Sequence, residues 1–260
     1  MRRWIGAVLG LVWAQTPLDA LWAERDNPEK AREAVQALEK LLAQKSSDQE
    51  SVVRLARLYY LLGEQAADKK ERLELYDKAF QRCRAGLVEA LGLPQGVKDE
   101  EIVAKADKAH LPLLYWAAAA LARWGKHAPF REKVAARSRI RLYWDRVYAL
   151  DPTYFHGGAY RFFGGYYALV PAITGEQDVN KSRENFEKAV QVAPYYLETK
   201  VLYAEAYAAH PKVSDRKRFR QLLEEVQAAP VGEDPDYAAE NRLAKKKAEA
   251  LLAQEAELFD

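Results

Sequence analysis

Apolar residues recur at three- and four-residue steps along most of the chain, whereas the two-residue alternation of a strand is almost absent. Such spacing places apolar side chains along one face of a helix. The pattern predicts about ten or eleven helices and no sheet. The clearest groups are Ala31, Val35, Leu38 and Leu42; Val52, Leu55, Ala56 and Tyr59; Ile140, Trp144 and Val147; Phe186, Ala189 and Val190; and Phe219, Leu222, Leu223 and Val226.

Two features of the pattern predict where the core lies. Leu113–Trp124 (LLYWAAAALARW) is apolar on most sides, which predicts a central buried helix. Cys83 is the only cysteine, so it cannot form an intramolecular disulfide. It shares an apolar stripe with other core residues, which predicts a buried thiol. That stripe consists of Leu73, Tyr76, Phe80 and Leu87.

Cap-forming and helix-breaking residues divide the chain at regular intervals. Asparagine, aspartate and serine favour the first turn of a helix, and glycine or proline favours its end. Starts are predicted at Asn27-Pro28, Asp99-Glu100 and Ser214-Asp215. Ends are predicted at Gly92-Leu93-Pro94, Asp151-Pro152, Ala193-Pro194 and Ala229-Pro230.

Part of the chain follows the spacing of the tetratricopeptide repeat, a helix pair whose second helix ends in an aromatic, a small residue and a proline. Gly164 and Tyr167 stand three apart, as the glycine and tyrosine of its first helix do. The predicted fold is all-α: antiparallel helix pairs in a right-handed tetratricopeptide-like superhelix, with a long C-terminal helix. Two units, 42 residues apart, carry the second-helix spacing: Trp144, Val147 and Pro152, then Phe186, Ala189 and Pro194.

Composition and charge give no argument for a polyanionic partner. The 260 residues are 49% hydrophobic and 30% charged, with a formal net charge of +2. This balance supports a substantial core and argues against disorder. Because basic and acidic residues are interspersed, we expect neither nucleic acid nor a membrane surface as a partner.

The first residues have the pattern of a secretory signal. A basic start, Met1-Arg2-Arg3, precedes the apolar run Trp4–Val12, and Val12-Trp13-Ala14 fits a cleavage site. We therefore expect a signal peptide over residues 1–14, a single helical domain over residues 15–260, and a soluble periplasmic protein. No cysteine follows the apolar run, so a lipoprotein signal is not expected, and no run predicts a membrane span.

The motifs of common catalytic and cofactor sites are missing from the sequence. The four histidines (His110, His127, His156 and His210) are far apart, and none has a partner at metal-ligand spacing. No G-x-S-x-G, Walker or dinucleotide-binding motif occurs. We expect no enzyme, cofactor or metal, although a Ser, a His and an acid brought together only by the fold remain an alternative.

The segment Tyr154–Pro171, YFHGGAYRFFGGYYALVP, combines aromatic residues with two Gly-Gly pairs and one arginine. Aromatic rings with polar tips can wall an apolar cavity, and an arginine can hold a carboxylate. The same residues could instead be packing features of a repeat helix. The candidate ligand-binding residues are Tyr154, His156, Arg161, Tyr166, Tyr167, Tyr203 and Tyr207.

Two of these candidates, and Asn241 outside the set, have alternative roles. Arg161 would either anchor a ligand carboxylate or pair with an acid such as Glu205 on a neighbouring helix. His156 would either contact ligand or fix the entry of its helix. Asn241, near the end of the chain, would clamp the last helix by hydrogen bonds or serve a ligand.

The second half of the chain resembles a known family. The resemblance is carried by HGGAYRFFGGYYALVP, Gly175–Asp178 (GEQD), Ser182–Val190 (SRENFEKAV) and Lys200–Ala208 (KVLYAEAYA). These residues resemble the T-component of tripartite ATP-independent periplasmic (TRAP) transporters. The likeness covers roughly residues 111–259, and includes Glu240-Asn241 on the last long helix.

The resemblance implies a helical periplasmic protein that encloses a pocket for a hydrophobic or amphipathic small molecule. It also implies docking of a periplasmic solute-binding protein, and it leaves homo-oligomerisation open. Two departures are the missing lipobox cysteine and Glu176-Gln177-Asp178 in place of a second glycine. The alternative function is a tetratricopeptide-type scaffold that binds only protein segments in the cell envelope.

Overall fold

The structure, a computed structural model, describes residues 17–44 and 48–259. These residues form thirteen α-helices, two 3-10 turns and one π-helical segment, and no strand. The elements are α1 Pro17–Ala23, α2 Pro28–Gln44, α3 Gln49–Gln65, α4 Lys69–Ala90, α5 Asp99–Lys105, η1 Lys108–His110, α6 Leu111–His127, α7 Phe130–Leu150, α8 Tyr154–Leu169, η2 Ala172–Thr174, α9 Val179–Val192, α10 Glu198–Leu202, η3 Tyr203–Ala208, α11 Arg216–Ala228, α12 Ala238–Ala253 and α13 Glu255–Phe259.

The all-α prediction is confirmed, with more helices than expected. Helices α1, α5, α10 and α13 have only five to seven residues, too short for a periodic pattern to show. The predicted starts hold: Asn27 Oδ1 accepts the backbone N–H of Glu29 at 2.9 Å, and the Asp215 side chain caps α11. The predicted ends also hold, since α4, α7, α9 and α11 all stop before the marked residues.

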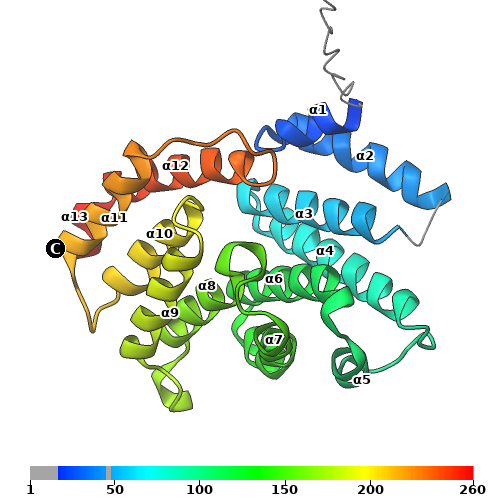
Figure 1. Cartoon of the computed structure of the whole chain (residues 1–260). Helices are drawn as coiled ribbons and strands as arrows, with labels where there is room; N and C mark the ends of the chain where they lie inside the picture. Colours follow the sequence, from blue (N-terminus) through cyan, green and yellow to red (C-terminus); the bar gives the residue numbers. More distant parts are fainter. Residues whose placement is uncertain (1–16, 45–47, 260) are drawn as a thin grey trace, which may run out of the picture.

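Consecutive helices pack against each other, as a repeat of helix pairs would. The closest neighbours are α2 with α3, α3 with α4, α4 with α6, α6 with α7, and α8 with α9. Their ribbons follow one another around an arc in Figure 1. The right-handed tetratricopeptide superhelix itself stays a prediction.

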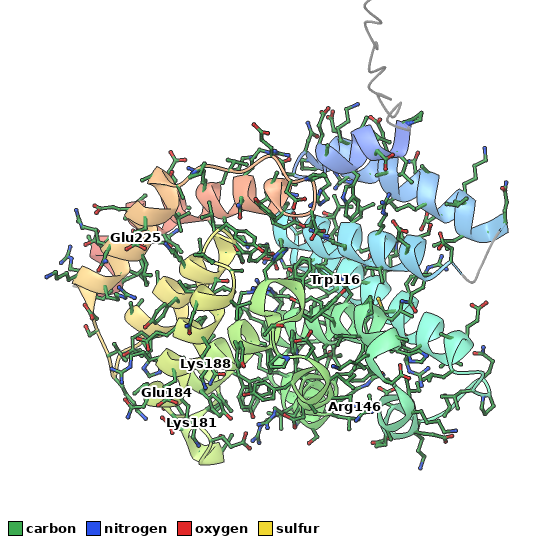
Figure 2. The ribbon with its side chains drawn as sticks, viewed as in Figure 1. Trp116, Arg146, Lys181, Glu184, Lys188 and Glu225 are labelled. Carbon is green, nitrogen blue, oxygen red and sulfur yellow. The ribbon has the colours of Figure 1, made fainter. Side chains whose placement is uncertain are left out.

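Two hydrophobic cores fill the molecule, and α8 contributes to both. Residues from α1 to the middle of α8 form the first core, and residues from the end of α8 to α13 form the second. As predicted, α6 is buried along most of its length. Trp116, near the centre of Figure 2, lies on that helix, whereas Lys181, Glu184 and Lys188 lie along the exposed side of α9. Cys83 is fully buried, and burial raises the pKa of its thiol.

The last long helix, α12, starts beside the first helices and runs away from them toward α11 and α13 (Figure 1). Partly buried ion pairs hold this contact. Lys247 on α12 bonds Glu64 on α3 at 2.7 Å and Glu198 on α10 at 2.8 Å. Arg123 on α6 bonds the same two carboxylates at 3.1 and 3.2 Å. Helices α3, α6, α10 and α12 thus share one network of charges.

Asn241 adds neutral hydrogen bonds to the same region. Its side-chain oxygen accepts the backbone N–H of Leu197 at 2.9 Å, and its amide donates to the carbonyls of Tyr195 and Val231, both at 2.9 Å. These bonds join α12 to the segment before α10. The clamp expected for Asn241 is therefore present.

The predicted signal peptide, residues 1–14, lies outside the described residues. Among the helices of residues 17–44 and 48–259, none has the length and apolar character needed to cross a membrane.

Candidate functional site

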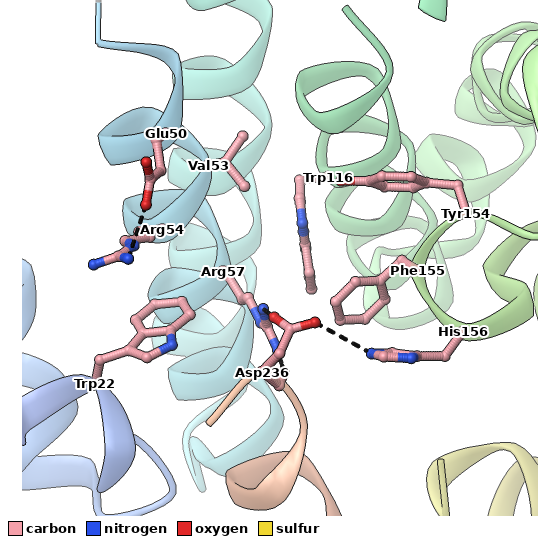
Figure 3. A pocket seen from close by; sticks show the side chains of 10 residues that line it. All are labelled: Trp22, Glu50, Val53, Arg54, Arg57, Trp116, Tyr154, Phe155, His156 and Asp236. Atoms are coloured by element: carbon pink, nitrogen blue, oxygen red, sulfur yellow. Dashed lines mark hydrogen bonds and ion pairs between the residues drawn. The ribbon is translucent and has the colours of Figure 1, made fainter. Parts of the chain in front are cut away.

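A cavity of about 450 Å³ lies where the first helices of the chain meet α6, the start of α8 and the segment before α12. Figure 3 shows residues of α3 on one side of it and residues of α8 on the other. Aromatic rings and charged groups alternate on its wall. The lining residues are Trp22, Glu50, Val53, Arg54, Arg57, Trp116, Tyr154, Phe155, His156 and Asp236.

The α8 wall is a left-handed turn. Phe155, His156 and Gly157 have φ of 48°, 58° and 73°, so the right-handed helix starts only at Gly158. Glycine adopts this conformation readily, but for other residues it costs roughly 1–2 kcal/mol each. A Cβ on Gly157 would also lie 3.1 Å from the Cα of Ala189 on α9. Two strained residues in succession need a specific restraint.

Arg161 supplies that restraint. The side chain is buried, and it donates to the carbonyls of His156 and Phe155 at 2.9 and 3.2 Å. It also donates to the hydroxyls of Tyr115 at 3.0 Å and Thr199 at 3.3 Å. Arg161 therefore fixes the backbone of the turn from behind the cavity wall.

The suggested pairing of Arg161 with Glu205 is wrong. Glu205 bonds Lys126 at 3.1 Å instead. The Arg161 guanidinium lies 4.6 Å from the ring centre of Tyr196 and among hydroxyl and carbonyl oxygens. Although burial lowers its pKa, Tyr115 and Tyr196 raise it, and the net shift is upward.

His156 lines the cavity and contacts Tyr196, just before α10, and Asp236, just before α12. Its ring stacks on Tyr196 with centroids 4.6 Å apart. Its Nε2 is buried without a hydrogen-bond partner among the described residues and lies 3.5 Å from Asp236 Oδ2. The contact with His156 and the Arg57 guanidinium hold the pKa of Asp236 well below its ordinary value.

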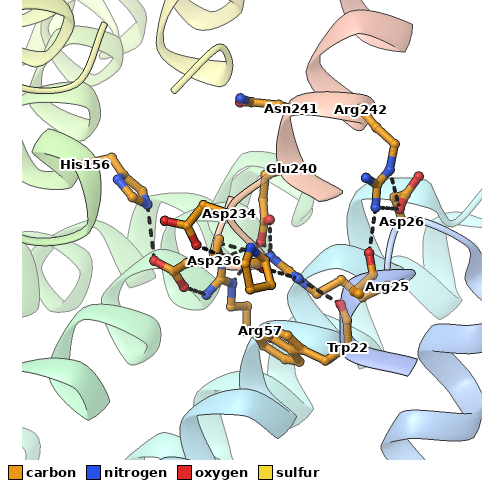
Figure 4. Close-up of polar contacts among 12 residues, drawn as sticks. Trp22, Arg25, Asp26, Arg57, His156, Asp234, Asp236, Glu240, Asn241 and Arg242 are labelled. Atoms are coloured by element: carbon orange, nitrogen blue, oxygen red, sulfur yellow. Dashed lines mark hydrogen bonds and ion pairs between the residues drawn. The ribbon is translucent and has the colours of Figure 1, made fainter. Parts of the chain in front are cut away.

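Buried charges close the floor of the cavity (Figure 4). Arg25 and Arg57 both bond the buried carboxylate of Glu240, at 2.5 and 2.8 Å. Arg57 also bonds Asp236 at 2.7 Å. Arg25 further donates to the carbonyls of Trp22 and Pro235, at 2.8 and 2.7 Å. The turn before α2, helix α3 and the start of α12 are thereby joined.

Arg57 also lies near three aromatic rings. Its guanidinium carbon lies 5.1 Å from the ring centre of Trp22, 5.5 Å from that of Trp116 and 4.7 Å from that of Phe155. A cation over ring faces is stabilised by their electron-rich surface. Burial lowers the pKa of Arg57, but Glu240 and Asp236 raise it above its ordinary value.

The structure brings only Tyr154 and His156, of the seven predicted residues, to the cavity. Tyr166 donates to Glu176, and Tyr167 packs 5.9 Å from Phe163. Tyr203 is nearly fully buried and stacks on Phe186 in the second core, with ring centroids 5.0 Å apart. The ring centroid of Tyr207 lies 5.2 Å from that of Tyr203. These rings pack among other side chains.

Several lining residues were not predicted. One signal was available: Glu50, Val53, Arg54 and Arg57 follow one face of α3 at steps of three and four. That face carries one apolar and three charged residues, which is typical of a solvent-exposed face and does not indicate a cavity wall. Asp236 lies 179 positions from Arg57, and periodicity does not show such a contact.

The cavity carries acids, arginines and one histidine, but its geometry forms no recognised catalytic or metal arrangement. Among residues 17–44 and 48–259, no group of three His, Cys, Asp or Glu side chains could hold a metal ion. His210 contacts Gln177 at 3.4 Å, and His110 contacts Asp107 at 2.7 Å on the surface. What the cavity offers chemically is aromatic surface beside charged groups.

Comparison with known families gives a match that covers most of the chain. No curated protein matches the chain by sequence. The sequence model of the family TAtT, TRAP transporter T-component, matches residues 29–259. The match begins well before residue 111, the start of the resemblance noted in the sequence, and it includes most of α2 and the cavity wall on α3. The chain therefore belongs to the TRAP transporter T-component family.

Proposed function

We propose that this protein is a non-enzymatic, periplasmic component of a TRAP-type solute uptake system. It binds a hydrophobic or amphipathic carboxylate and docks a periplasmic solute-binding protein. Family membership supports the place in the transport system. The aromatic cavity between α3, α6 and α8 carries the ligand claim.

The cavity has the properties of a small-molecule site. Its volume of about 450 Å³ falls within the roughly 300–1,000 Å³ of such pockets. Trp22, Trp116, Tyr154 and Phe155 give the wall its aromatic groups, and five charged or titratable side chains lie beside them. A ligand there touches Tyr154 and His156 directly, and Arg161 acts through the turn that carries both.

Extraction of the purified full chain tests the ligand claim. The protein is purified without detergent or delipidation, and its organic extract is analysed by mass spectrometry. Val53→Trp places an indole in the cavity and should abolish the co-purifying compound. Val134→Trp is the matched control, because Val134 is exposed on α7. A compound retained by Val53→Trp with a wild-type melting temperature would contradict binding in this cavity.

Co-elution tests the partner claim separately. The solute-binding protein encoded beside this chain, if the gene neighbourhood contains one, should shift its gel-filtration volume when mixed at micromolar concentration. Absence of a complex, with the small molecule present, would remove docking and retain ligand binding. A complex without any small molecule would favour the scaffold alternative.

A further inference from the structure

We infer that Arg54 on α3 holds the carboxylate of the bound ligand, and that the apolar tail lies across the cavity on α6 and α8. This assignment rests on the proposed function. It identifies which of the basic side chains on the wall, Arg54, Arg57 and His156, binds the anion.

Arg57 is committed to the protein. Its side chain is only 5% exposed, and it bonds Glu240, itself only 6% exposed. A ligand carboxylate that took Arg57 from Glu240 would leave a buried acid unpaired, which is strongly destabilising. Arg57 therefore serves as part of the floor.

His156 faces Asp236, an acid that an ion pair with Arg57 holds in place. Its Nε2 lies 3.5 Å from Asp236, and Asp236 is tied to Arg57 at 2.7 Å. A ligand carboxylate beside His156 would meet the negative charge of Asp236 at short range, and like charges repel. This end of the cavity disfavours an anionic head group.

Arg54 differs from Arg57 in its exposure and from His156 in the acids beside it. Its side chain is 29% exposed, and its partners Asp19 and Glu50 are 43% and 72% exposed. Ion pairs between exposed groups contribute little, so exchanging one for a ligand carboxylate costs little. Glu50 can turn to solvent, and the planar guanidinium then binds the ligand carboxylate through two parallel hydrogen bonds.

The opposite wall suits an aliphatic tail. Trp116 and Phe155 meet edge to face with ring centroids 4.8 Å apart, and Tyr154 extends the same wall. Figure 3 shows Arg54 and Glu50 on the α3 side and these rings on the other side. A ligand with a carboxylate at Arg54 therefore directs its chain onto apolar surface.

Isothermal titration of the full chain with decanoate and with 1-decanol tests this assignment. Arg54→Gln should weaken decanoate by about 10-fold or more, because a charge-assisted hydrogen bond is lost, and should leave 1-decanol unchanged. Glu50→Gln removes the competing acid and should strengthen decanoate by up to about fivefold. Octanoate should bind about 15-fold more weakly than decanoate, since each methylene contributes about fourfold.

Arg32→Gln is the matched control, because Arg32 is also exposed and pairs with Glu71 at 3.0 Å on another surface. It should bind decanoate as the wild type does. Wild-type affinity for decanoate in Arg54→Gln, or a weaker affinity in Glu50→Gln, would overturn the assignment while the proposed function stands. Failure of the wild type to bind decanoate, decanol and octanoate would overturn both the assignment and the carboxylate ligand.

Discussion

The two ends of α8 have similar sequences and different structures. Each carries aromatic residues beside a Gly-Gly pair, HGG at the start and FGG near the end. The start is a left-handed turn on the cavity wall, whereas the end is a regular helix packed against α9. The comparison shows that composition alone does not separate a cavity wall from a packed core.

The glycines explain how each end reaches its structure. Gly157 has a φ of 73°, and a Cβ on Gly158 would lie 2.6 Å from the Tyr115 hydroxyl. At the other end, a Cβ on Gly164 would lie 2.7 Å from the Phe186 ring, whereas Gly165 has open space around it. The first pair allows a turn held by hydrogen bonds, and the second allows a close ring contact.

The stability of the protein should depend more on buried charge beside the cavity, at the start of α12, than on charge on α9, which packs against the other end of α8. Glu240→Gln leaves Arg25 and Arg57 buried without their shared carboxylate. Such a loss costs about 3–5 kcal/mol, measured as the free energy of unfolding in urea. Glu184→Gln, on the exposed side of α9, should change it by less than about 0.5 kcal/mol. Similar values for the two variants would remove this distinction.

The left-handed turn should fail without its arginine. Arg161→Gln cannot reach all four oxygens, so buried carbonyls of the turn lose their donor. We expect a loss of about 2–3 kcal/mol in unfolding free energy, because hydrogen bonds to a charged group are removed. Arg183→Gln, on exposed α9, is the control. If Arg161→Gln unfolds like wild type and keeps wild-type affinity for decanoate, the turn does not depend on Arg161.

The packed end should respond to volume. Gly164→Ala forces the Phe186 ring to move and should cost about 1–3 kcal/mol of stability. Gly165→Ala meets no atom within 4 Å and should stabilise by about 0.5–1 kcal/mol, because alanine restricts the unfolded chain. Urea denaturation of the two neighbouring variants gives the comparison directly. Equal shifts of the same sign would mean that Phe186 does not pack on Gly164.

Much of the fold could be predicted from the sequence, because it follows from local rules. Asn27 and Asp215 cap helices as expected, and Cys83 is in the core. The left-handed turn could not be predicted, since the carbonyls of Phe155 and His156 are held by Arg161, a contact that the local sequence does not show. Of the candidate ligand residues, only Tyr154 and His156 line the cavity, because aromatic density does not show which rings have space beside them.

The opposite wall was missed for a different reason. Arg54 and Arg57 lie in a segment where helical spacing was the only signal, and charged residues on a helix usually face solvent. Their partners come from α1 and from residue Asp236 before α12. Only the closure of the first helices against the last, which joins distant segments, turns this face into a cavity wall.

The smallest expected effect is the acid dependence of the cavity end. Asp236 has a lowered pKa in the folded protein, whereas the unfolded chain binds its proton near pH 3.9. Its contribution is therefore complete above about pH 4 and is lost as the pH falls below that. Asp236→Asn should be less stable than the wild type at pH 7, and the difference should shrink as the pH is lowered to 3. Because other acids with lowered pKa, such as Glu64, are present in both chains, they cancel in this difference. A constant difference in urea midpoint from pH 7 to pH 3 would show that Asp236 acts through shape and not through charge.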